Sequence, residues 1–286
     1  MRFICCSILL LISTVSASEP PALLPAPTRL VLQQGEFDFT SGFSIDAPDN
    51  ILLKQATERF VRRLAMQTGG DIADMPQKTL RVKVTAARQN NIPAVQMNEQ
   101  YQLRISQHNI ELEAITETGV LRGLETLLQL EKNGKAPALQ LYDAPRFSWR
   151  GVLLDPARRF LPFPTLLRQL DIMAAVKLNV LHLHLTDDQG WRFESKRFPR
   201  LHQLGGKQGY YTQQQLRQLV QYAAERGIRV VPEIDLPGHT TALGVAYPEL
   251  MSQPGPKQPE KHWGVHPAVL DPTNEAVYDF LTELIT

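Results

Sequence analysis

Cysteine is almost absent from this chain of 286 residues, and the position of its two cysteines limits their chemistry. Cys5 and Cys6 both fall in an apolar run, residues 3–12, which follows Met-Arg and precedes a small-residue stretch that ends at Ala17. This layout predicts a secretory signal peptide over residues 1–17, with an uncleaved signal anchor as the alternative. The run is too short to cross a bilayer as a helix. The mature chain then has no disulfide, thiolate nucleophile or zinc–thiolate site, and an exported protein without disulfides suits a bacterial periplasm or secretion.

An excess of charge of one sign is also missing. The chain has 30 Lys and Arg against 29 Asp and Glu, which gives a net charge of +1. Proteins that bind nucleic acids or anionic membrane surfaces usually carry a strong excess of positive charge, which this composition lacks. We therefore expect no nucleic-acid partner, no membrane contact beyond the signal peptide, and a neutral or weakly charged ligand. Composition does not fix the oligomeric state.

The periodicity of apolar residues divides the chain into two parts after a proline-rich spacer at residues 18–27. Residues 28–143 mix strand and helix patterns and predict a small α+β domain. Its expected elements are strands near 29–32 and at 80–85, 101–106 and 110–114, and helices at 51–67 and 118–131.

Strands and helices alternate in the second part, residues 146–286. The strand segments are apolar throughout, as in a parallel sheet that is buried on both faces, so this part is predicted to be α/β. Its expected elements are strands at 151–155, 179–185 and 229–235, and helices at 165–176, at 213–226 and from about 272.

A glycine-rich phosphate loop is missing after the first of these strands, where Asp155-Pro-Ala-Arg158 stands instead. This favours a (β/α)8 TIM barrel over an open doubly wound sheet. Polar residues at three strand ends favour the barrel too, because barrel enzymes build their sites there. We predict the fold class α/β, with a small α+β domain followed by a truncated TIM barrel of about three βα units. The polar residues are Asp155 with Arg158, Asp187 with Asp188, and Glu233 with Asp235 and His239.

Two histidines, His182 and His184, lie two positions apart in the strand expected at 179–185. Because side chains alternate along a strand, both share one face and leucines occupy the other. Such a pair could chelate zinc in a metal-dependent hydrolase, but His239 is the only further histidine at a strand end, and catalytic zinc takes three protein ligands. We therefore expect His182 and His184 to be buried, hydrogen-bonded residues of the barrel interior, with no metal or other cofactor.

Three long motifs occur in order within residues 146–286. They are FSWRGVLLD from Phe147 with Ala157-Arg158 after it, LNVLHLHLTDDQGW from Leu178, and PEIDLPGH up to His239. At matching spacing, they closely resemble consecutive barrel segments of glycoside hydrolase family 20, the β-N-acetylhexosaminidases. The stretch GVLRGLETLLQL from Gly119 also resembles the end of the small domain that precedes the barrel in that family. The resemblance covers nearly the whole mature chain, and is strongest after Phe147.

This resemblance implies retaining hydrolysis of terminal non-reducing N-acetyl-β-hexosamine residues of a glycan or oligosaccharide, without metal or cofactor. In this family the acetamide oxygen of the substrate attacks the anomeric carbon, which makes these enzymes exceptions to the two-carboxylate scheme. Arg158 corresponds to the arginine that binds sugar hydroxyls, a task that suits the fixed fork of a guanidinium. Asp187 and His239 correspond to a pair that supports the catalytic acid, and Asp235 to a further member of that network.

Two departures from the family pattern concern this site. Where the family usually has a histidine after the sugar-binding arginine, this chain has Arg159. The family's adjacent Asp-Glu pair, which supplies the acetamide-orienting group and the acid, follows the helix that here starts near Thr273, and this sequence ends at Thr286. We therefore expect an N-terminal fragment of the enzyme that is itself inactive. A non-hydrolytic or vestigial sugar-binding protein is the alternative, and a metal hydrolase that uses His182 and His184 is less favoured.

Overall fold

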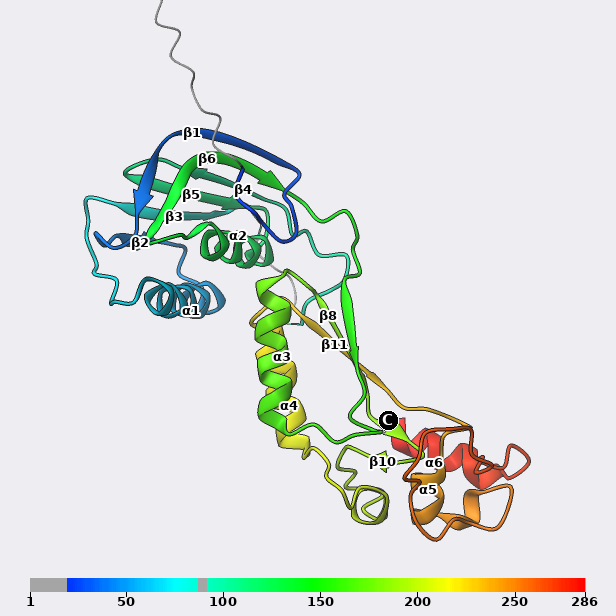
Figure 1. The fold of residues 1–286 in the computed structure, drawn as a ribbon. Helices are drawn as coiled ribbons and strands as arrows, with labels where there is room; N and C mark the ends of the chain where they lie inside the picture. Colours follow the sequence, from blue (N-terminus) through cyan, green and yellow to red (C-terminus); the bar gives the residue numbers. More distant parts are fainter. Residues whose placement is uncertain (1–19, 87–91, 286) are drawn as a thin grey trace, which may run out of the picture.

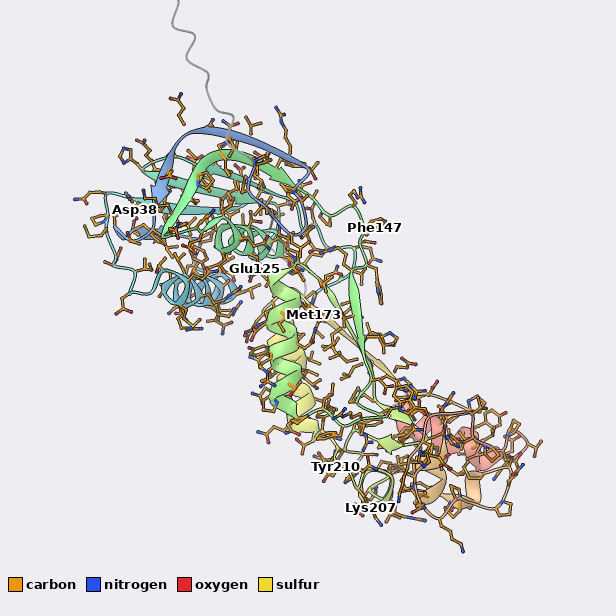
Figure 2. All side chains as sticks on the ribbon, viewed as in Figure 1. Asp38, Glu125, Phe147, Met173, Lys207 and Tyr210 are labelled. Atoms are coloured by element: carbon orange, nitrogen blue, oxygen red, sulfur yellow. The ribbon has the colours of Figure 1, made fainter. Side chains whose placement is uncertain are left out.

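The computed structural model describes residues 20–86 and 92–285, so the predicted signal peptide lies outside the described residues (Figure 1). Two separate β-sheets form the centres of two units, and the segment 144–150 connects them. Figure 2 shows Phe147 on this segment, where its side chain is 65% exposed. Among the described residues, no helix is both long and apolar enough to span a membrane.

The first unit is a six-stranded mixed sheet with two helices on one face (Figure 1). The strand order is β1-β6-β4-β5-β3-β2, in which β2, β3 and β5 are parallel and the remaining pairs are antiparallel. Apolar side chains of both helices and of the sheet form one core. The α+β expectation for this part is confirmed. Its elements are β1 (Arg29–Asp38), β2 (Ser44–Asp46), α1 (Ile51–Thr68), β3 (Thr79–Val84), β4 (Tyr101–Ile105), β5 (Asn109–Ala114), α2 (Glu117–Leu130) and β6 (Lys135–Asp143).

Strands β2 and β6 were not predicted from the sequence. Strand β6 contains Pro137, and proline has no N–H to donate to a neighbouring strand. The pairing shows how the sheet accommodates it: β4 pairs with β6 only from Leu139 onward, so at Pro137 the strand has β1 as its one neighbour. Strand β2 is only three residues long and therefore has almost no periodicity to detect.

The second unit begins with a three-stranded parallel sheet of order β11-β8-β7 (Figure 1). Leucines of the central strand, Leu181 and Leu183, face the helices α3 and α4 and are fully buried with them. A capping box between Thr212 and Gln215 starts α4. Three parallel strands joined by two helices form the barrel-like part that the alternating pattern predicted. The elements are β7 (Gly151–Leu154), α3 (Phe163–Ala175), β8 (Val180–His184), α4 (Gln213–Ala224) and β11 (Arg229–Glu233).

Shorter elements follow the strand ends and surround Trp191 in a core of their own. The last helix starts later than the sequence predicted, because the carboxylate of Asp271 accepts hydrogen bonds from the backbone and hydroxyl of Thr273 and holds a non-helical turn. The elements are the hairpin strands β9 (Thr186–Asp187) and β10 (Gly190–Trp191), the π-helical turn η1 (Leu201–Gly205), α5 (Thr241–Ala246), the 3-10 turn η2 (Pro248–Leu250) and α6 (Glu275–Ile285).

A buried carboxylate joins the two units. Glu99 accepts from Arg122 of α2 at 2.6 Å, from Arg150 at 2.6 Å and from the amide of Asn179 at 3.2 Å. Arg122 also donates to the backbone oxygens of Arg226 and Gly227, in the turn before β11. Burial alone would raise the pKa of Glu99, but the two guanidinium groups hold it below its ordinary value. This network fixes the small domain on the sheet that carries the polar strand ends.

Candidate active site

The parallel sheet brings three chain segments to one edge. Because β7, β8 and β11 run in the same direction, their carboxyl ends lie together, and the polar residues that follow them meet there. Backbone hydrogen bonds continue the pairing past the strands, from Ala157 N to His184 O at 3.3 Å and from Leu185 N to Glu233 O at 3.0 Å. The loops that follow are therefore held beside one another.

Asp187 is the centre of this cluster, and its side chain is 1% exposed. One oxygen, Oδ2, lies 2.6 Å from Nη2 of Arg158 and 2.9 Å from Nε2 of His184. The other, Oδ1, accepts from the backbone N–H of Asp188 at 2.6 Å and lies 3.2 Å from Nδ1 of His239. Burial alone would raise the pKa of Asp187, but the hydrogen bonds from His184 and Asp188 and the charges of Arg158 and His239 hold it below its ordinary value. The carboxylate is thus ionised, and each of its two oxygens has two polar contacts.

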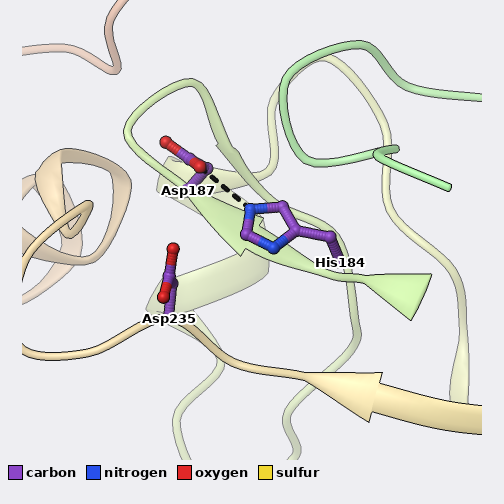
Figure 3. Close-up of side chains that lie close together, drawn as sticks. All are labelled: His184, Asp187 and Asp235. Atoms are coloured by element: carbon purple, nitrogen blue, oxygen red, sulfur yellow. Dashed lines mark hydrogen bonds and ion pairs between the residues drawn. The ribbon is translucent and has the colours of Figure 1, made fainter. Parts of the chain in front are cut away.

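His184 lies between two carboxylates. Its Nε2 contacts Asp187, as Figure 3 shows, and its Nδ1 lies 3.0 Å from Oε1 of Glu233. The hydrogen bond to Asp187 raises the pKa of His184 most, burial opposes it, and Glu233 and the charge of Asp155 add to the rise, which brings the pKa to about 9. The imidazole is therefore protonated at neutral pH.

The outcome for His182 differs in part from the expectation. His182 and His184 do face away from the leucines, and both contact carboxylates. The side chain of His182, however, is 33% exposed, because the residues described on that side of the sheet do not cover it. Its Nε2 lies 2.5 Å from Oε2 of Glu233, although the angles there are not those of a hydrogen bond.

Arg158 projects from the loop after β7 and is clamped by two carboxylates. Its Nη1 lies 2.7 Å from Asp155 Oδ2, its Nη2 contacts Asp187, and its backbone N–H donates to Asp155. Burial would lower the pKa of Arg158, but these carboxylates raise it above its ordinary value. The side chain remains 24% exposed, whereas the neighbouring Arg159 is exposed and takes no part in the cluster. The structure therefore places Arg158, and not Arg159, at the edge where the strands end.

His239 follows β11 and has a left-handed backbone conformation with φ of 54°. Its Nδ1 lies 3.1 Å from Oδ2 of Asp188, in addition to the contact with Asp187. Asp188 is itself fixed by the backbone N–H and hydroxyl of Thr241. The imidazole is 38% exposed, so one side of its ring is accessible.

Asp235 lies beside His184 and Asp187 at the same edge (Figure 3). The hydroxyl of Thr186 on β9 accepts from its backbone N–H at 2.9 Å. The structure thus brings together all four residues that the sequence singled out: Arg158, Asp187, Asp235 and His239.

Two groups of side chains have the spacing that a metal ion would need. They are His184, Asp187 and Asp235, and Asp187, Asp188 and His239, with candidate ligand atoms within 4.8 Å of one another. Asp187 belongs to both, yet protein donors already occupy its lone pairs, so a cation would have to displace Arg158 or His184. Within residues 20–86 and 92–285, neither group includes His182, which the zinc alternative requires. That no metal is bound stays a prediction.

Several residues of the cluster received no role from the sequence. Glu233 and Asp188 were visible as polar strand ends, but nothing in the pattern showed that each would contact a histidine. Trp263 was not singled out at all: its ring lies 5.4 Å from the guanidinium of Arg158 and is 78% exposed. Its loop is held to the site by hydrogen bonds from Gln189 to His262 O and from Glu260 N to Asp188 O. No sequence periodicity marks such a contact between distant loops.

Two models of one family match nearly the whole chain. The model described as glycosyl hydrolase family 20, catalytic domain, matches residues 147–286, and the model described as domain 2 of the same family matches residues 20–144.

Relatives and solved structures match in the same way. A β-hexosaminidase of Vibrio furnissii is 33% identical over 91% of this chain and 45% of its own length. The β-hexosaminidase subunit alpha of Mus musculus is 33% identical over 96% of this chain and 56% of its own. The structure of Flavobacterium johnsoniae chitobiase superposes with a TM-score of 0.84 at 38% identity, and covers 92% of this chain and 42% of that one. This chain spans about half, or less, of the length of these relatives.

Proposed function

Because the chain belongs to glycoside hydrolase family 20, we propose that the polypeptide containing it is a β-N-acetylhexosaminidase, which removes terminal N-acetyl-β-hexosamine residues from a glycan or oligosaccharide. The observation that carries this proposal is the cluster of Arg158, Asp187 and His239 at the carboxyl ends of three parallel strands. The position of this cluster and the types of residue in it are those that the family motif requires.

Arg158 is proposed to bind hydroxyls at the non-reducing end of the sugar. A guanidinium has five N–H donors, and the two contacts to Asp155 and Asp187 engage only part of them. The same contacts fix the plane of the group, so its outward donors are oriented before a sugar arrives. Such preorganisation reduces the entropy cost of binding.

Asp187 and His239 are proposed to support the catalytic acid, with Asp235 as a third member of the network. The 3.2 Å contact with Asp187 holds Nδ1 of His239, and the accessible side of the imidazole is free to approach a further carboxylate. The resemblance assigns the acid and the acetamide-orienting group to an adjacent Asp-Glu pair, and these 286 residues contain no such dipeptide. The proposed activity therefore belongs to a polypeptide that supplies this pair.

Three further points are proposals about the same polypeptide. Residues 1–17 act as a signal peptide and residues 18–27 as a spacer, so the protein is exported to the periplasm or the medium of a bacterium. Residues 28–143 form the small domain, and residues 146–286 form part of the catalytic barrel. The sugar residue that reacts carries no charge, in agreement with the net charge of only +1 on this chain.

A non-hydrolytic sugar-binding protein is the second candidate, and the observation that favours it is Arg158, whose fixed guanidinium can bind sugar hydroxyls without a catalytic acid. Such a protein would retain Arg158 and bind N-acetylhexosamines without turning them over.

One experiment distinguishes the hexosaminidase from the non-hydrolytic sugar-binding protein. The release of chromophore from an aryl N-acetyl-β-glucosaminide and from the galactosaminide is measured with the complete natural polypeptide and with residues 18–286. We expect turnover by the complete polypeptide and none by residues 18–286. If the complete polypeptide binds N-acetylglucosamine but releases no chromophore, the binding protein is correct. Turnover by residues 18–286 at a comparable rate would place acid and base among the carboxylates described here and would contradict the assigned roles.

A further inference from the structure

Carboxylates and imidazoles alternate from the accessible edge of the site back into the sheet. His239 contacts Asp187 at 3.2 Å, and the other oxygen of Asp187 contacts His184 at 2.9 Å. The second nitrogen of His184 then lies 3.0 Å from Glu233. We call these four residues the relay chain. Its first two members belong to the network that the family motif implies, whereas His184 and Glu233 have no role there.

The position of His184 and Glu233 follows from the strand register. Strands β8 and β11 are parallel neighbours, and His184 pairs directly with Glu233 across them. Both side chains therefore project from the same side of the sheet, at adjacent points of its carboxyl edge. Asp187 is three residues after His184, in the hairpin that leaves the strand, so the register of two strands sets the spacing of the relay chain.

The contacts of His184 favour its protonated form. A neutral imidazole has one donor and one acceptor nitrogen, and it could donate to only one of two carboxylates. Both nitrogens of His184 face carboxylate oxygens within 3.0 Å, so both must carry a proton to make favourable contacts. The side chain is 6% exposed, which leaves water little access to substitute for either partner.

We propose that His184 and Glu233 are positioning residues of the hydrolase: Glu233 holds His184 as an imidazolium, and His184 fixes the orientation and charge of Asp187, which in turn holds the ring of His239 in place. This inference rests on the proposed function, because His239 acts only through the catalytic acid. No proton has to move along the relay chain. Its members act by charge and by hydrogen bonds, and Asp187 cannot rotate without losing contacts on both oxygens.

Other titratable or charged groups face the relay chain from each element around it. Arg158 and Asp155 approach from the end of β7, Asp188 from the hairpin, His182 from β8, and Asp235 from the loop after β11. Among these groups the carboxylates outnumber Arg158, which is the permanent cation. The positive charge of His184 therefore compensates part of the negative charge of the cluster. Replacing His184 by a neutral side chain removes this compensation, together with one of the two contacts that fix Oδ2 of Asp187.

The test uses the complete natural polypeptide with His184→Gln and Glu233→Gln. Histidine ring signals are titrated by nuclear magnetic resonance, and His239→Gln identifies the signals of His239. We expect His184→Gln to change the chemical shifts of the His239 ring at constant pH, because Asp187 loses a contact that fixes its orientation. Glu233→Gln should lower the pKa of His184. In both variants kcat should fall, while KM changes less than kcat.

His202→Gln is the matched control, because His202 is also a buried histidine but contacts Ser195 outside the relay chain. It should leave the ring signals of His239 unchanged. Unchanged His239 signals in His184→Gln, with activity reduced only in proportion to the folded protein, would overturn the proposal. If His184→Gln changes the His239 signals as expected but the unaltered polypeptide releases no chromophore from either aryl glycoside, the hexosaminidase function fails and the role of His184 in the reaction fails with it, while the structural link between His184 and His239 is retained.

Discussion

Arg192 donates two hydrogen bonds to the backbone oxygen of Ala157, the residue immediately before Arg158. Its Nε lies 3.1 Å and its Nη2 2.7 Å from that oxygen, and further bonds reach the carbonyls of Pro156, Gln189 and Gly209. The side chain is completely buried. Burial lowers the pKa of Arg192, but the group stays charged because an arginine starts from so high a value. One guanidinium therefore connects the loop of Arg158 to the hairpin of Asp187.

We predict that Arg192→Met destabilises the protein by about 3–5 kcal/mol, because several buried carbonyl groups lose a charged donor at once. The free energy of unfolding is measured by urea titration. Arg197→Met is the control: Arg197 pairs with Glu283 at the surface, is 67% exposed, and should change the free energy by less than about 0.5 kcal/mol. Similar losses in both variants would show that the internal bonds of Arg192 contribute little.

Gly190→Ala should reproduce the effect of Arg192→Met without removing the guanidinium. A Cβ at this position would lie 2.1 Å from Cζ of Arg192, so the guanidinium would have to move away from the carbonyls. We expect a lower unfolding temperature and, in the complete polypeptide, a higher KM for aryl N-acetyl-β-glucosaminide because the loop of Arg158 is released. Gly70→Ala has open space around its Cβ and serves as the control. An unchanged KM in a folded Gly190→Ala protein would contradict the link to Arg158.

Arg158→Lys should weaken sugar binding roughly 10–100-fold, because an ammonium cannot contact both carboxylates and two sugar hydroxyls in one plane. The measurement is the affinity of the complete polypeptide for N-acetylglucosamine. Arg159→Lys is a closely matched control, since it is the same substitution at the next residue, which is exposed and outside the cluster. If Arg159→Lys weakens binding and Arg158→Lys does not, the assignment of the sugar-binding arginine is wrong.

The strand ends show what the sequence could and could not provide. The alternation of leucine and histidine in β8 correctly predicted which side chains face the helices, because strand periodicity depends only on neighbouring residues. The meeting of Arg158, Asp187 and His239 was also predictable, since parallel strands end at one edge. The partners of Arg192 and Trp263 were not. A charged residue is ordinarily expected at the surface, and only the folded backbone brings the carbonyls of Pro156, Ala157, Gln189 and Gly209 together so that Arg192 can be buried.

The pH dependence of stability should show the charge of His184. Its pKa is about 9 in the folded protein and 6.5 as an ordinary histidine. A raised folded pKa means that its contribution to stability is complete below pH 6.5 and is lost as pH rises through about 9. The pKa of Asp187 is lowered, so its contribution is present above the ordinary value of 3.8 and is lost as pH falls through its folded value.

The measurement is the free energy of unfolding at pH 6, 7.5 and 9 for the unaltered protein and for His184→Gln. Other groups titrate as well, so the difference between the two proteins is the relevant quantity. We expect this difference to be largest at pH 6 and to shrink by pH 9. A constant difference across this range would mean that His184 is neutral in the folded protein.

The junction of the two units should depend on the charge of Glu99. Glu99→Gln leaves Arg122 and Arg150 with buried positive charge and no anionic partner, which should cost about 3–5 kcal/mol of folding free energy. Because Arg122 also holds the turn before β11, the loss should appear as weaker coupling of the units: hydrogen exchange should increase in β11 and in α2 together. Glu111→Gln is the control, since Glu111 pairs with Arg104 on the exposed face of the first sheet and should change stability by less than about 1 kcal/mol. Faster exchange confined to α2 would show that the small domain folds independently of the strands that carry the site.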